Sequence, residues 1–435
     1  MSNVDLIPEK NNKKIINAWC SYDIANSAYS LSISTVLYPI YYQSITKQAW
    51  GSDLVSFMGI SIKNTVLYDY FIAFGYTIII FLTPLLSGIA DMGGYRKRFM
   101  QFFTLIGSLS CIGLYWFNGN NIIFGVALPA LAVVGFAGSL VYYNSFLPII
   151  ATPDRHDKIS AKGFSWGYGG SMILLIFNLY CIENYQKFGF TGKLDAIKFA
   201  FVEVGIWWFV IAQIAFWHLK EYKGGFTVKT HVFAKGFQEI IKVFSIIKKN
   251  TTMVNFLLSF FLFSIGVQTI ILVATLFGSK ELGIEGSKLI VTILLIQILA
   301  LVGAAFFGWV STKKGNKFSL ITMLIIWSVV CFIAYFIHND IQFFILASLV
   351  GLVMGGIQSQ ARSTFSKLIP ENSKDTASYF SFYDITEKAA IVFGMLSFGF
   401  IEQVTGSMRL SALLLSVFFL ASLVIVAKTK LTKIM

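Results

Sequence analysis

The sequence predicts an all-α membrane protein with twelve transmembrane helices, built as two parallel six-helix repeats. Composition is the first reason, because 56% of the 435 residues are hydrophobic and only 13% are charged, whereas a soluble domain carries about 25% charged residues. The second reason is that the apolar residues are grouped in long blocks. The third is that loop sequences of the first half recur in the second half.

Twelve apolar blocks are each long enough to cross a hydrocarbon layer about 30 Å thick, which takes about 20 helical residues. A helix satisfies the backbone polar groups of the segment within itself, as a spanning segment requires. The predicted helices lie at 17–43, 69–90, 99–117, 122–147, 164–182, 199–219, 253–277, 289–311, 318–337, 341–366, 379–401 and 410–428.

Lysine and arginine residues are distributed unequally between the predicted loops. With the N-terminus placed inside, 24 of the 34 fall in inside segments and 7 in outside loops, and the remaining three lie within helices. This bias predicts that both termini are cytoplasmic. The net charge of +13 therefore reflects topology and contact with anionic membrane lipids, and we expect no nucleic-acid partner.

The longest predicted cytoplasmic connection follows the sixth helix and divides the chain into two halves. The predicted divisions are a cytoplasmic N-terminal tail at 1–16, a six-helix half at 17–219, a cytoplasmic linker at 220–250, a second six-helix half at 251–428 and a cytoplasmic tail at 429–435.

An internal repeat supports this division. The loop after helix 2 (SGIADMGGYRKR) resembles the loop after helix 8 (GWVSTKKGNK), with Gly94 aligned on Gly315. The loops after helices 4 and 10 match at nearly the same offset, with Pro153 aligned on Pro370. An even number of helices separates the two copies, so the repeats are predicted to be parallel.

The loop after helix 2 resembles the signature of the major facilitator superfamily in five residues: Gly88, Asp91, Gly94, Arg96 and Lys97. Longer stretches resemble the superfamily's branch of autophagy-linked vacuolar effluxers and their bacterial relatives: 18–30, 142–170, 355–373, 381–394 and 405–409. The resemblance implies the major facilitator fold and efflux of a small solute, with amino acids as the first candidate. The absence of the larger insertions expected of the fungal proteins favours a bacterial inner membrane.

Helix 1 carries a continuous polar face. Asp23, Asn26, Ser27 and Ser30 recur at helical spacing on a segment that is otherwise apolar, so this face should line a cavity or a neighbouring helix. We expect Asn26, Ser27 and Ser30 to lie in the cavity. Asp23 is predicted to be either a site for a substrate amine or a proton, or a gate residue that joins the cytoplasmic helix ends.

Helix 10 carries Gln358, Gln360 and Arg362 near its inner end. An arginine keeps its proton, so Arg362 requires an anion, either a substrate carboxylate or a protein acid. Buried ionisable groups in a membrane are by default functional candidates. We expect these three residues to bind substrate or to take part in coupling.

Helix 11 supplies Asp384, Glu387 and Lys388. Asp384 and Lys388 are four residues apart and are expected to neutralise each other. Glu387 has no such local partner, so it ranks first as the acid that pairs with Arg362 or carries a transported proton, and Asp23 ranks second. Helix 4 adds two further candidates for the cavity, Tyr143 and Asn144.

The loop after helix 2 is predicted to act as a gate. Asp91 ends helix 2 and should meet the positive N-terminus of helix 11 across the seam between the halves, with Gly94, Arg96 and Lys97 as the rest of the gate. The alternative is a cluster of positive charge that only stops translocation. Thr312 stands where the second copy would have the acid, so we expect a latch that is stronger on one side.

The functional class follows from what the chain contains and lacks. It has no GxxxxGK[ST] phosphate loop and no grouping of His, Asp and Cys for catalysis or metal binding, so we expect neither an enzyme nor a cofactor. The leading hypothesis is a monomeric secondary transporter that moves a small polar organic solute by alternating access, coupled to protons or another ion. The alternative is a non-transporting receptor or a lipid-handling protein on the same fold.

Overall fold

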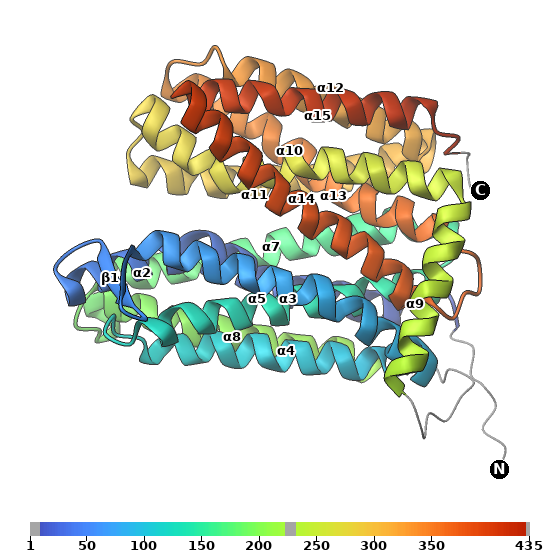
Figure 1. Cartoon of the computed structure of the whole chain (residues 1–435), viewed down its shortest axis with the longest axis horizontal. Helices are drawn as coiled ribbons and strands as arrows, with labels where there is room; N and C mark the ends of the chain where they lie inside the picture. Colours follow the sequence, from blue (N-terminus) through green and yellow to red (C-terminus); the bar gives the residue numbers. More distant parts are fainter. Residues whose placement is uncertain (1–8, 222–231, 432–435) are drawn as a thin grey trace.

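The computed structural model describes residues 9–221 and 232–431. The predicted tails and the predicted linker lie partly outside these residues. Long helices run side by side along one axis in two groups, one from each half of the chain (Figure 1). The structure thus has the all-α architecture that the apolar blocks predict.

Six helical runs form the first group. The first run is continuous through α1 (Lys13–Ala28), a π-helical segment η1 (Tyr29–Leu37) and α2 (Tyr38–Trp50). A small antiparallel hairpin of β1 (Leu54–Phe57) and β2 (Ile60–Lys63) follows it. The other long helices are α3 (Asn64–Gly93), α4 (Arg96–Gly113), α5 (Ile122–Ser145), α7 (His156–Glu183) and α8 (Lys193–His218), with the short α6 (Leu147–Ile150) after α5.

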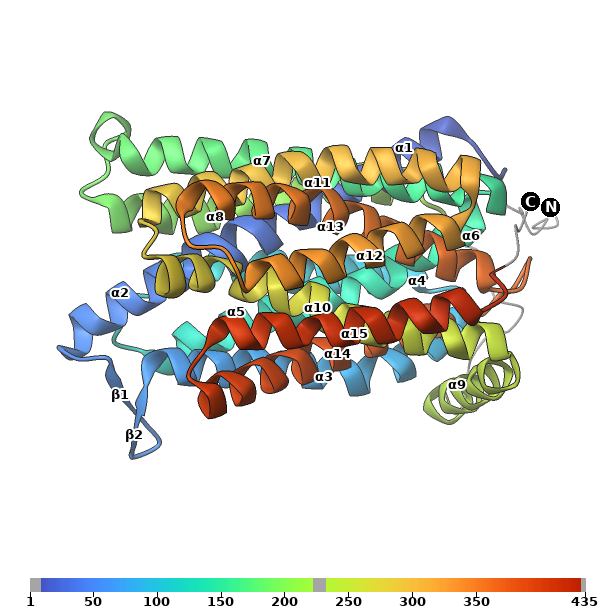
Figure 2. The same ribbon diagram turned by 90° about the horizontal axis from the view of Figure 1, so that it is seen from above.

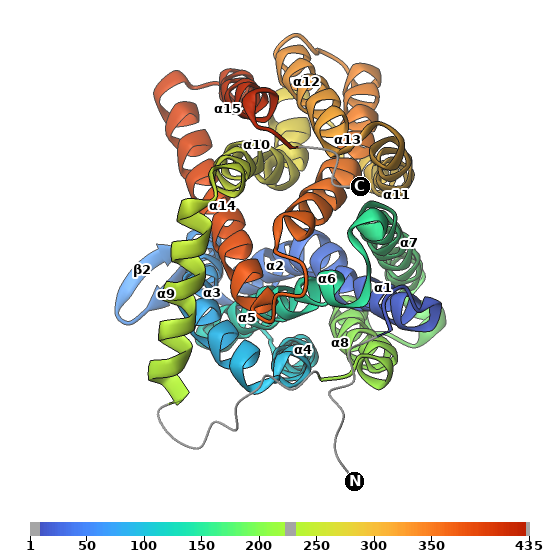
Figure 3. The same ribbon diagram turned by 90° about the vertical axis from the view of Figure 1, so that its right-hand side faces the viewer.

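The second group repeats this count. It contains α10 (Thr251–Leu282), α11 (Gly286–Lys314), α12 (Asn316–Ala334), α13 (Asp340–Leu368), α14 (Thr376–Thr405) and α15 (Met408–Lys428). Between the groups, α9 (Val232–Lys249) lies across one end of the bundle (Figures 1 and 3). We call this end the α9 end. The start of α1 and the finish of α15 lie there too (Figure 2).

Ten helices in the described part of the chain are long and apolar enough to cross a membrane. Two further runs, α1–η1–α2 and α14, lie beside them in the bundle (Figure 2). These two runs carry several of the polar candidates of the sequence analysis, including Asp23 on the first and Asp384, Glu387 and Lys388 on the second. The architecture is consistent with twelve spans.

The packing between the halves has the symmetry of a parallel repeat. The fifth run, α7, packs against α11 and α13, the eighth and tenth runs. The eleventh run, α14, packs against α3 and α5, the second and fourth runs. A shift of six helices converts one set of contacts into the other. The aligned loop glycines agree, because both Gly94 and Gly315 have positive φ, 69° and 86°.

Small residues let the helices within a half approach closely. A Cβ on Gly303 of α11 would lie 1.8 Å from the carbonyl oxygen of Leu352 on α13, and one on Gly355 would lie 2.0 Å from that of Ala300. Such contacts are typical of membrane helices, whose association depends on close packing. Each half has its own buried apolar core, and Ala377 and Val141 belong to the core of the other half, so apolar as well as polar contacts cross the seam.

Candidate functional site

Arg362 and Asp23 form a buried ion pair across the seam. Arg362 on α13 places Nη2 3.2 Å from Oδ2 of Asp23 on α1, and the two residues are 2% and 5% exposed. The Arg362 side chain also donates from Nε to Ser160 Oγ and from Nη2 to the Ser160 carbonyl, both at 2.9 Å. Because these groups occupy its fork of donors, the guanidinium is fixed between the halves.

Aromatic rings and a tyrosine hydroxyl surround this pair. The Arg362 guanidinium carbon lies 4.8 Å from the ring centre of Trp19 and 4.2 Å from that of Phe164. Tyr143 donates from its hydroxyl to Asp23 Oδ2 at 2.6 Å, and Asn144 Oδ1 accepts from Arg362 Nη1 at 3.4 Å. The predicted candidates Asp23, Tyr143, Asn144 and Arg362 therefore meet at one place.

The ranking of partners for Arg362 was wrong. Glu387 was placed first and Asp23 second, but the carboxylate beside Arg362 is that of Asp23. Glu387 instead accepts from Gln268 Nε2 at 3.0 Å and pairs with Lys388 Nζ at 2.7 Å. The expectation that Glu387 lacks a local partner was also wrong, because the side chain of the adjacent residue, Lys388, pairs with it.

Asp384, Glu387 and Lys388 form a second buried charge cluster, on α14. Lys388 Nζ lies 3.2 Å from Asp384 Oδ1, so the pairing expected from their spacing is confirmed. The second carboxylate oxygen of Asp384, Oδ2, is buried and has no hydrogen-bond partner among the described residues. Two carboxylates share one ammonium, which leaves the cluster one positive charge short.

The remaining central candidates differ in exposure. Ser27 and Ser30 on the helix 1 face are half-buried, whereas Asn26 is buried. On the facing helices, Tyr168 of α7 donates its hydroxyl to Gln358 Oε1 of α13. These residues supply neutral hydroxyl and amide groups on α1, η1, α7 and α13.

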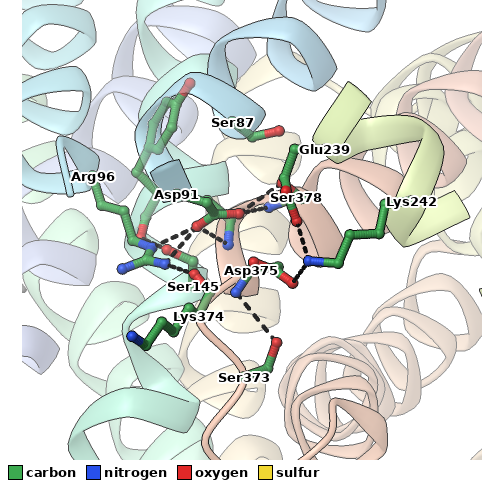
Figure 4. A network of polar contacts seen from close by, with 12 residues as sticks. Ser87, Asp91, Arg96, Ser145, Glu239, Lys242, Ser373, Lys374, Asp375 and Ser378 are labelled. Atoms are coloured by element: carbon green, nitrogen blue, oxygen red, sulfur yellow. Dashed lines mark hydrogen bonds and ion pairs between the residues drawn. The ribbon is translucent and has the colours of Figure 1, made fainter. Parts of the chain in front are cut away.

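Asp91 lies against the start of α14, as the gate prediction requires. It accepts from the backbone N–H of Ala377 at 3.1 Å and from the backbone N–H and hydroxyl of Ser378, both at 2.7 Å (Figure 4). Arg96 holds the same carboxylate, with Nη2 2.6 Å from Oδ1, and also donates to the Lys374 carbonyl. A carboxylate at a helix N-terminus accepts from the otherwise unpaired N–H donors of the first turn.

The other two gate candidates have different surroundings. Gly94 ends α3 in the left-handed conformation, with φ 69°, which turns the chain so that Arg96 can return to Asp91. Lys97 is half-buried and makes no ion pair within the described ranges. Lys97 therefore stands apart from the contact that Asp91 makes with α14.

A second polar contact joins the halves at the equivalent place, and the sequence analysis missed it. Asp157, in the first turn of α7, accepts from Ser311 Oγ at 2.8 Å, Asn316 Nδ2 at 2.7 Å and Lys367 Nζ at 2.7 Å. Its carboxylate is buried, with 2% of the side chain exposed. One sequence signal could have indicated this contact. It is an acid near the start of helix 5, opposite the loop after helix 8, which repeats the Asp91 loop.

The polarity of this second contact is reversed relative to the first. In the first contact the acid ends helix 2 and the donors from the other half come from helix 11. In the second the acid begins helix 5 and the donors come from helices 8, 9 and 10. Among the described residues, the Thr312 hydroxyl donates only to the Gly308 carbonyl of its own helix. Gln360, a candidate for substrate binding or coupling, accepts from Asn316 at 3.1 Å in this cluster.

The halves are joined by charge toward the α9 end. Asp23–Arg362 and Asp157–Lys367 cross the seam. At the opposite end, the ion pairs of the described residues each stay within one half: Lys47–Asp53, Glu183–Lys193, Lys280–Glu402, Lys288–Asp340 and Glu281–Arg409. The described conformation is therefore closed at the α9 end. In the described part of the chain, no three His, Cys, Asp or Glu residues gather as a metal site would require.

Comparison with known proteins gives this geometry a context. A family model described as "Vacuole effluxer Atg22 like" matches residues 11–434. The uncharacterized MFS-type transporter YxiO of Bacillus subtilis is 31% identical over 94% of both chains. Autophagy-related protein 22 of Saccharomyces cerevisiae is 25% identical over 75% of this chain and 70% of its own.

Solved structures of low sequence identity share the fold. The transporter FucP in its outward conformation superposes with a TM-score of 0.70 at 13% identity, covering 95% of this chain and 97% of FucP. The human organic anion transporter MFSD10 gives 0.72 at 10% identity, covering 96% and 100%. These proteins are membrane transporters and not enzymes. This chain is accordingly a member of the Atg22-like family of major facilitator superfamily transporters.

Proposed function

We propose that this transporter moves a small zwitterionic solute, with amino acids as the first class, and that a proton gradient drives it. The observation that carries the proposal is the unpartnered Oδ2 of Asp384 in a cluster of two carboxylates and one ammonium. A proton or a substrate ammonium group supplies the missing positive charge. Burial makes either neutralisation favourable, because an unpaired charge in a low-dielectric site is costly.

The opposite end of a zwitterion suits Arg362. A guanidinium recognises carboxylates through paired N–H donors, and Arg362 is held by the single carboxylate of Asp23 at 3.2–3.5 Å. A substrate carboxylate that competes with Asp23 would loosen the seam at the α9 end. In this scheme Asn26, Ser27, Ser30 and Gln358 supply neutral hydrogen bonds to the solute.

The family description supports the direction of transport. The matching family model is described as a vacuole effluxer, which moves solute out of the vacuole and so into the cytoplasm, and we propose that this chain likewise moves its solute across the inner membrane toward the cytoplasm of a bacterial cell. The halves predicted at 17–219 and 251–428 are then the two bodies that rock about the seam. Alternating access would open the α9 end to the cytoplasm by separating the contacts of Asp91 and Asp157.

Proteoliposomes containing a mixture of isotope-labelled amino acids test the substrate and the coupling together. Wild-type protein should move at least one amino acid faster under an imposed pH gradient, and a protonophore should remove the acceleration. Asp384→Asn should lose the response to the gradient while retaining exchange of labelled for unlabelled solute, because its neutral amide imitates the protonated state.

Glu402→Gln is the matched control, since it changes an acid on the same helix that pairs at the opposite end with Lys280. This variant should behave as wild type. Amino-acid movement that ignores the gradient would overturn the coupling. Failure to move any amino acid would overturn the substrate class, and no movement of any solute in a broader panel would favour the receptor or lipid-handling alternative.

The proposed orientation has a separate test. Single cysteines at Asn120 and Lys249 lie at opposite ends of the bundle, Asn120 just before α5 and Lys249 at the end of α9. A membrane-impermeant thiol reagent applied to intact cells should label the first and not the second. The native cysteines described here are buried and provide a low background. The reverse labelling pattern would place the α9 end outside.

A further inference from the structure

The helix α9 was not predicted within the cytoplasmic linker, and it has two distinct apolar faces. One face, with Gly236, Val243 and Ile247, is buried against the bundle, where α9 packs mainly on α3 and also touches α10 and α14. The approach to α3 is close, because a Cβ on Gly88 would lie 2.3 Å from the carbonyl oxygen of Gly236. This contact fixes α9 near the end of α3 that carries Asp91.

The other apolar face consists of Phe237, Ile241 and Phe244, which we call the α9 stripe. These side chains are 60%, 49% and 51% exposed, although their spacing of four and three residues places them on one side of the helix. Gln238, Ser245 and Lys249 lie on a different side and are exposed as well. The helix therefore presents an apolar stripe and a polar face besides the face that it buries.

The position of α9 determines what can cover the stripe. The helix lies crosswise to the spans, at the edge of the bundle outside α3 and α14 (Figure 3), and at the level where the spans end (Figure 1). A helix with this orientation and an apolar side lies in the plane of the membrane interface. Its C-terminal turn adds the exposed Lys248 and Lys249, which complement anionic headgroups.

The polar side of α9 reaches the first gate contact. Lys242 Nζ lies 2.7 Å from Glu239 and 3.0 Å from Asp375 (Figure 4). The hydrogen bond from Lys242 to Glu239, together with the nearby Asp375, holds the pKa of the Lys242 ammonium well above its usual range. Asp375 directly precedes α14, and Ala377 and Ser378 of its first turn donate to Asp91. One charged bridge thus connects α9 with the segment that closes the seam.

We propose that the α9 stripe inserts into the lipid leaflet at the α9 end, and that lipid-bound α9 braces the Asp91–Ser378 contact through Lys242 and Asp375. Anionic lipid would then favour the conformation closed at this end. The inference goes beyond the proposed substrate and coupling and does not depend on either. The partner is a phospholipid surface. Its acyl chains would contact the stripe, and its phosphate groups would contact Lys248 and Lys249.

The first test locates the stripe relative to the bilayer, with the full chain reconstituted in lipid nanodiscs. A fluorescent thiol probe is attached at Ile241→Cys or, as the matched control, at Gln238→Cys on the polar side. Acyl-chain-brominated phospholipid should quench the probe at 241 strongly and the probe at 238 weakly. Equal quenching at the two positions, or quenching at 238 alone, would overturn insertion. This measurement requires no transport, so a wrong substrate class would leave it unchanged.

The second test measures the brace through the distance between spin labels on Lys97 and Ser373, on the two sides of the seam. Lys242→Gln should raise the ratio of open to closed molecules by about fivefold, the low end of ordinary coupling between sites. Replacing the three stripe residues by serine, or omitting anionic lipid, should act in the same direction. Lys193→Gln is the control, since it removes the same charge from a lysine that pairs with a glutamate, Glu183, at the end of the bundle opposite α9. An unchanged ratio in the Lys242 variant would overturn the brace.

Discussion

The guanidinium of Arg362 lies 3.2 Å from the carboxylate of Asp23, and the two residues come from opposite halves of the transporter. Both are almost completely buried. A charge buried without a partner is far more costly than a buried pair. This pair therefore helps to keep the two halves closed at the α9 end. A substrate or proton that separates the pair must supply a new counter-charge to the residue that it leaves unpaired.

The pair predicts a strong energetic coupling between its two members. Arg362→Gln or Asp23→Asn alone should cost about 3–5 kcal/mol, because each strands a buried charge. The double variant should be more stable than the sum of the two losses predicts. Thermal unfolding of the four proteins in detergent gives the coupling energy. The control cycle of Arg362→Gln with Glu387→Gln should be additive, since Glu387 bonds elsewhere, and additivity in the Asp23 cycle would contradict the pairing.

Gly163 is predicted to be necessary for the pair to form. A Cβ at this position would lie 2.3 Å from Asp23 Oδ2 and 2.9 Å from Arg362 Nη2. Gly163→Ala should therefore destabilise the protein by about 1–3 kcal/mol, as overpacking does. Gly169→Ala is a control on the same helix, because its Cβ would meet only the flexible end of Leu301 at 3.2 Å. Equal melting temperatures for the two variants would argue against this role.

Asp91 is predicted to control conformation and not substrate affinity. Asp91→Asn removes the charge that accepts from Arg96 and from the first turn of α14, so molecules open at the α9 end should become more frequent. Distance measurements across the seam report this shift. Ser378→Ala should have a smaller effect, because the backbone N–H bond to Asp91 remains. A tenfold loss of affinity in a conformationally trapped protein, about 1.4 kcal/mol, would instead place Asp91 in the binding site.

The contact of Asp157 predicts that the second seam is also latched. Lys367→Met removes one of three donors to Asp157 and should open the α9 end to an extent comparable with Asp91→Asn. This outcome differs from the sequence-based expectation of a latch that is stronger on one side. Thr312→Val serves as the control, since the hydrogen bond that the Thr312 hydroxyl makes in the described part of the chain is to Gly308 of its own helix. Seam distances that change for Thr312→Val but not for Lys367→Met would refute the assignment.

Local patterns were sufficient for much of the fold. Each apolar block became a helical run because a span's hydrogen bonds are satisfied within the segment, and no distant residue is needed to decide that. The Asp91 contact was also predictable, because the repeated loops and the direction of each helix bring the end of helix 2 opposite the start of helix 11. The pairing of Asp384 with Lys388 follows from helical spacing alone.

The lateral relations between helices were not predictable in the same way. Depth along the helix made both Glu387 and Asp23 candidates for Arg362, with Glu387 ranked first. Only the packing of α7 against both α1 and α13 shows that Asp23 is the neighbour. Gln360 was expected from its helix to bind substrate or take part in coupling, but its rotation about the helix axis directs it to Asn316. Rotation and lateral contact depend on side chains from several helices, which a single segment does not contain.

By itself, then, the sequence determined the spans, the repeat and the presence of charges that need partners, since these depend on hydropathy, spacing and the cost of buried charge. The tertiary structure alone decided the partners: Asp23 for Arg362, Lys367 for Asp157, and Lys242 for Asp375. The physical reason is range. Hydrogen bonding along a helix is local, whereas an ion pair between distant segments forms only where packing brings the two charged atoms within about 4 Å of each other.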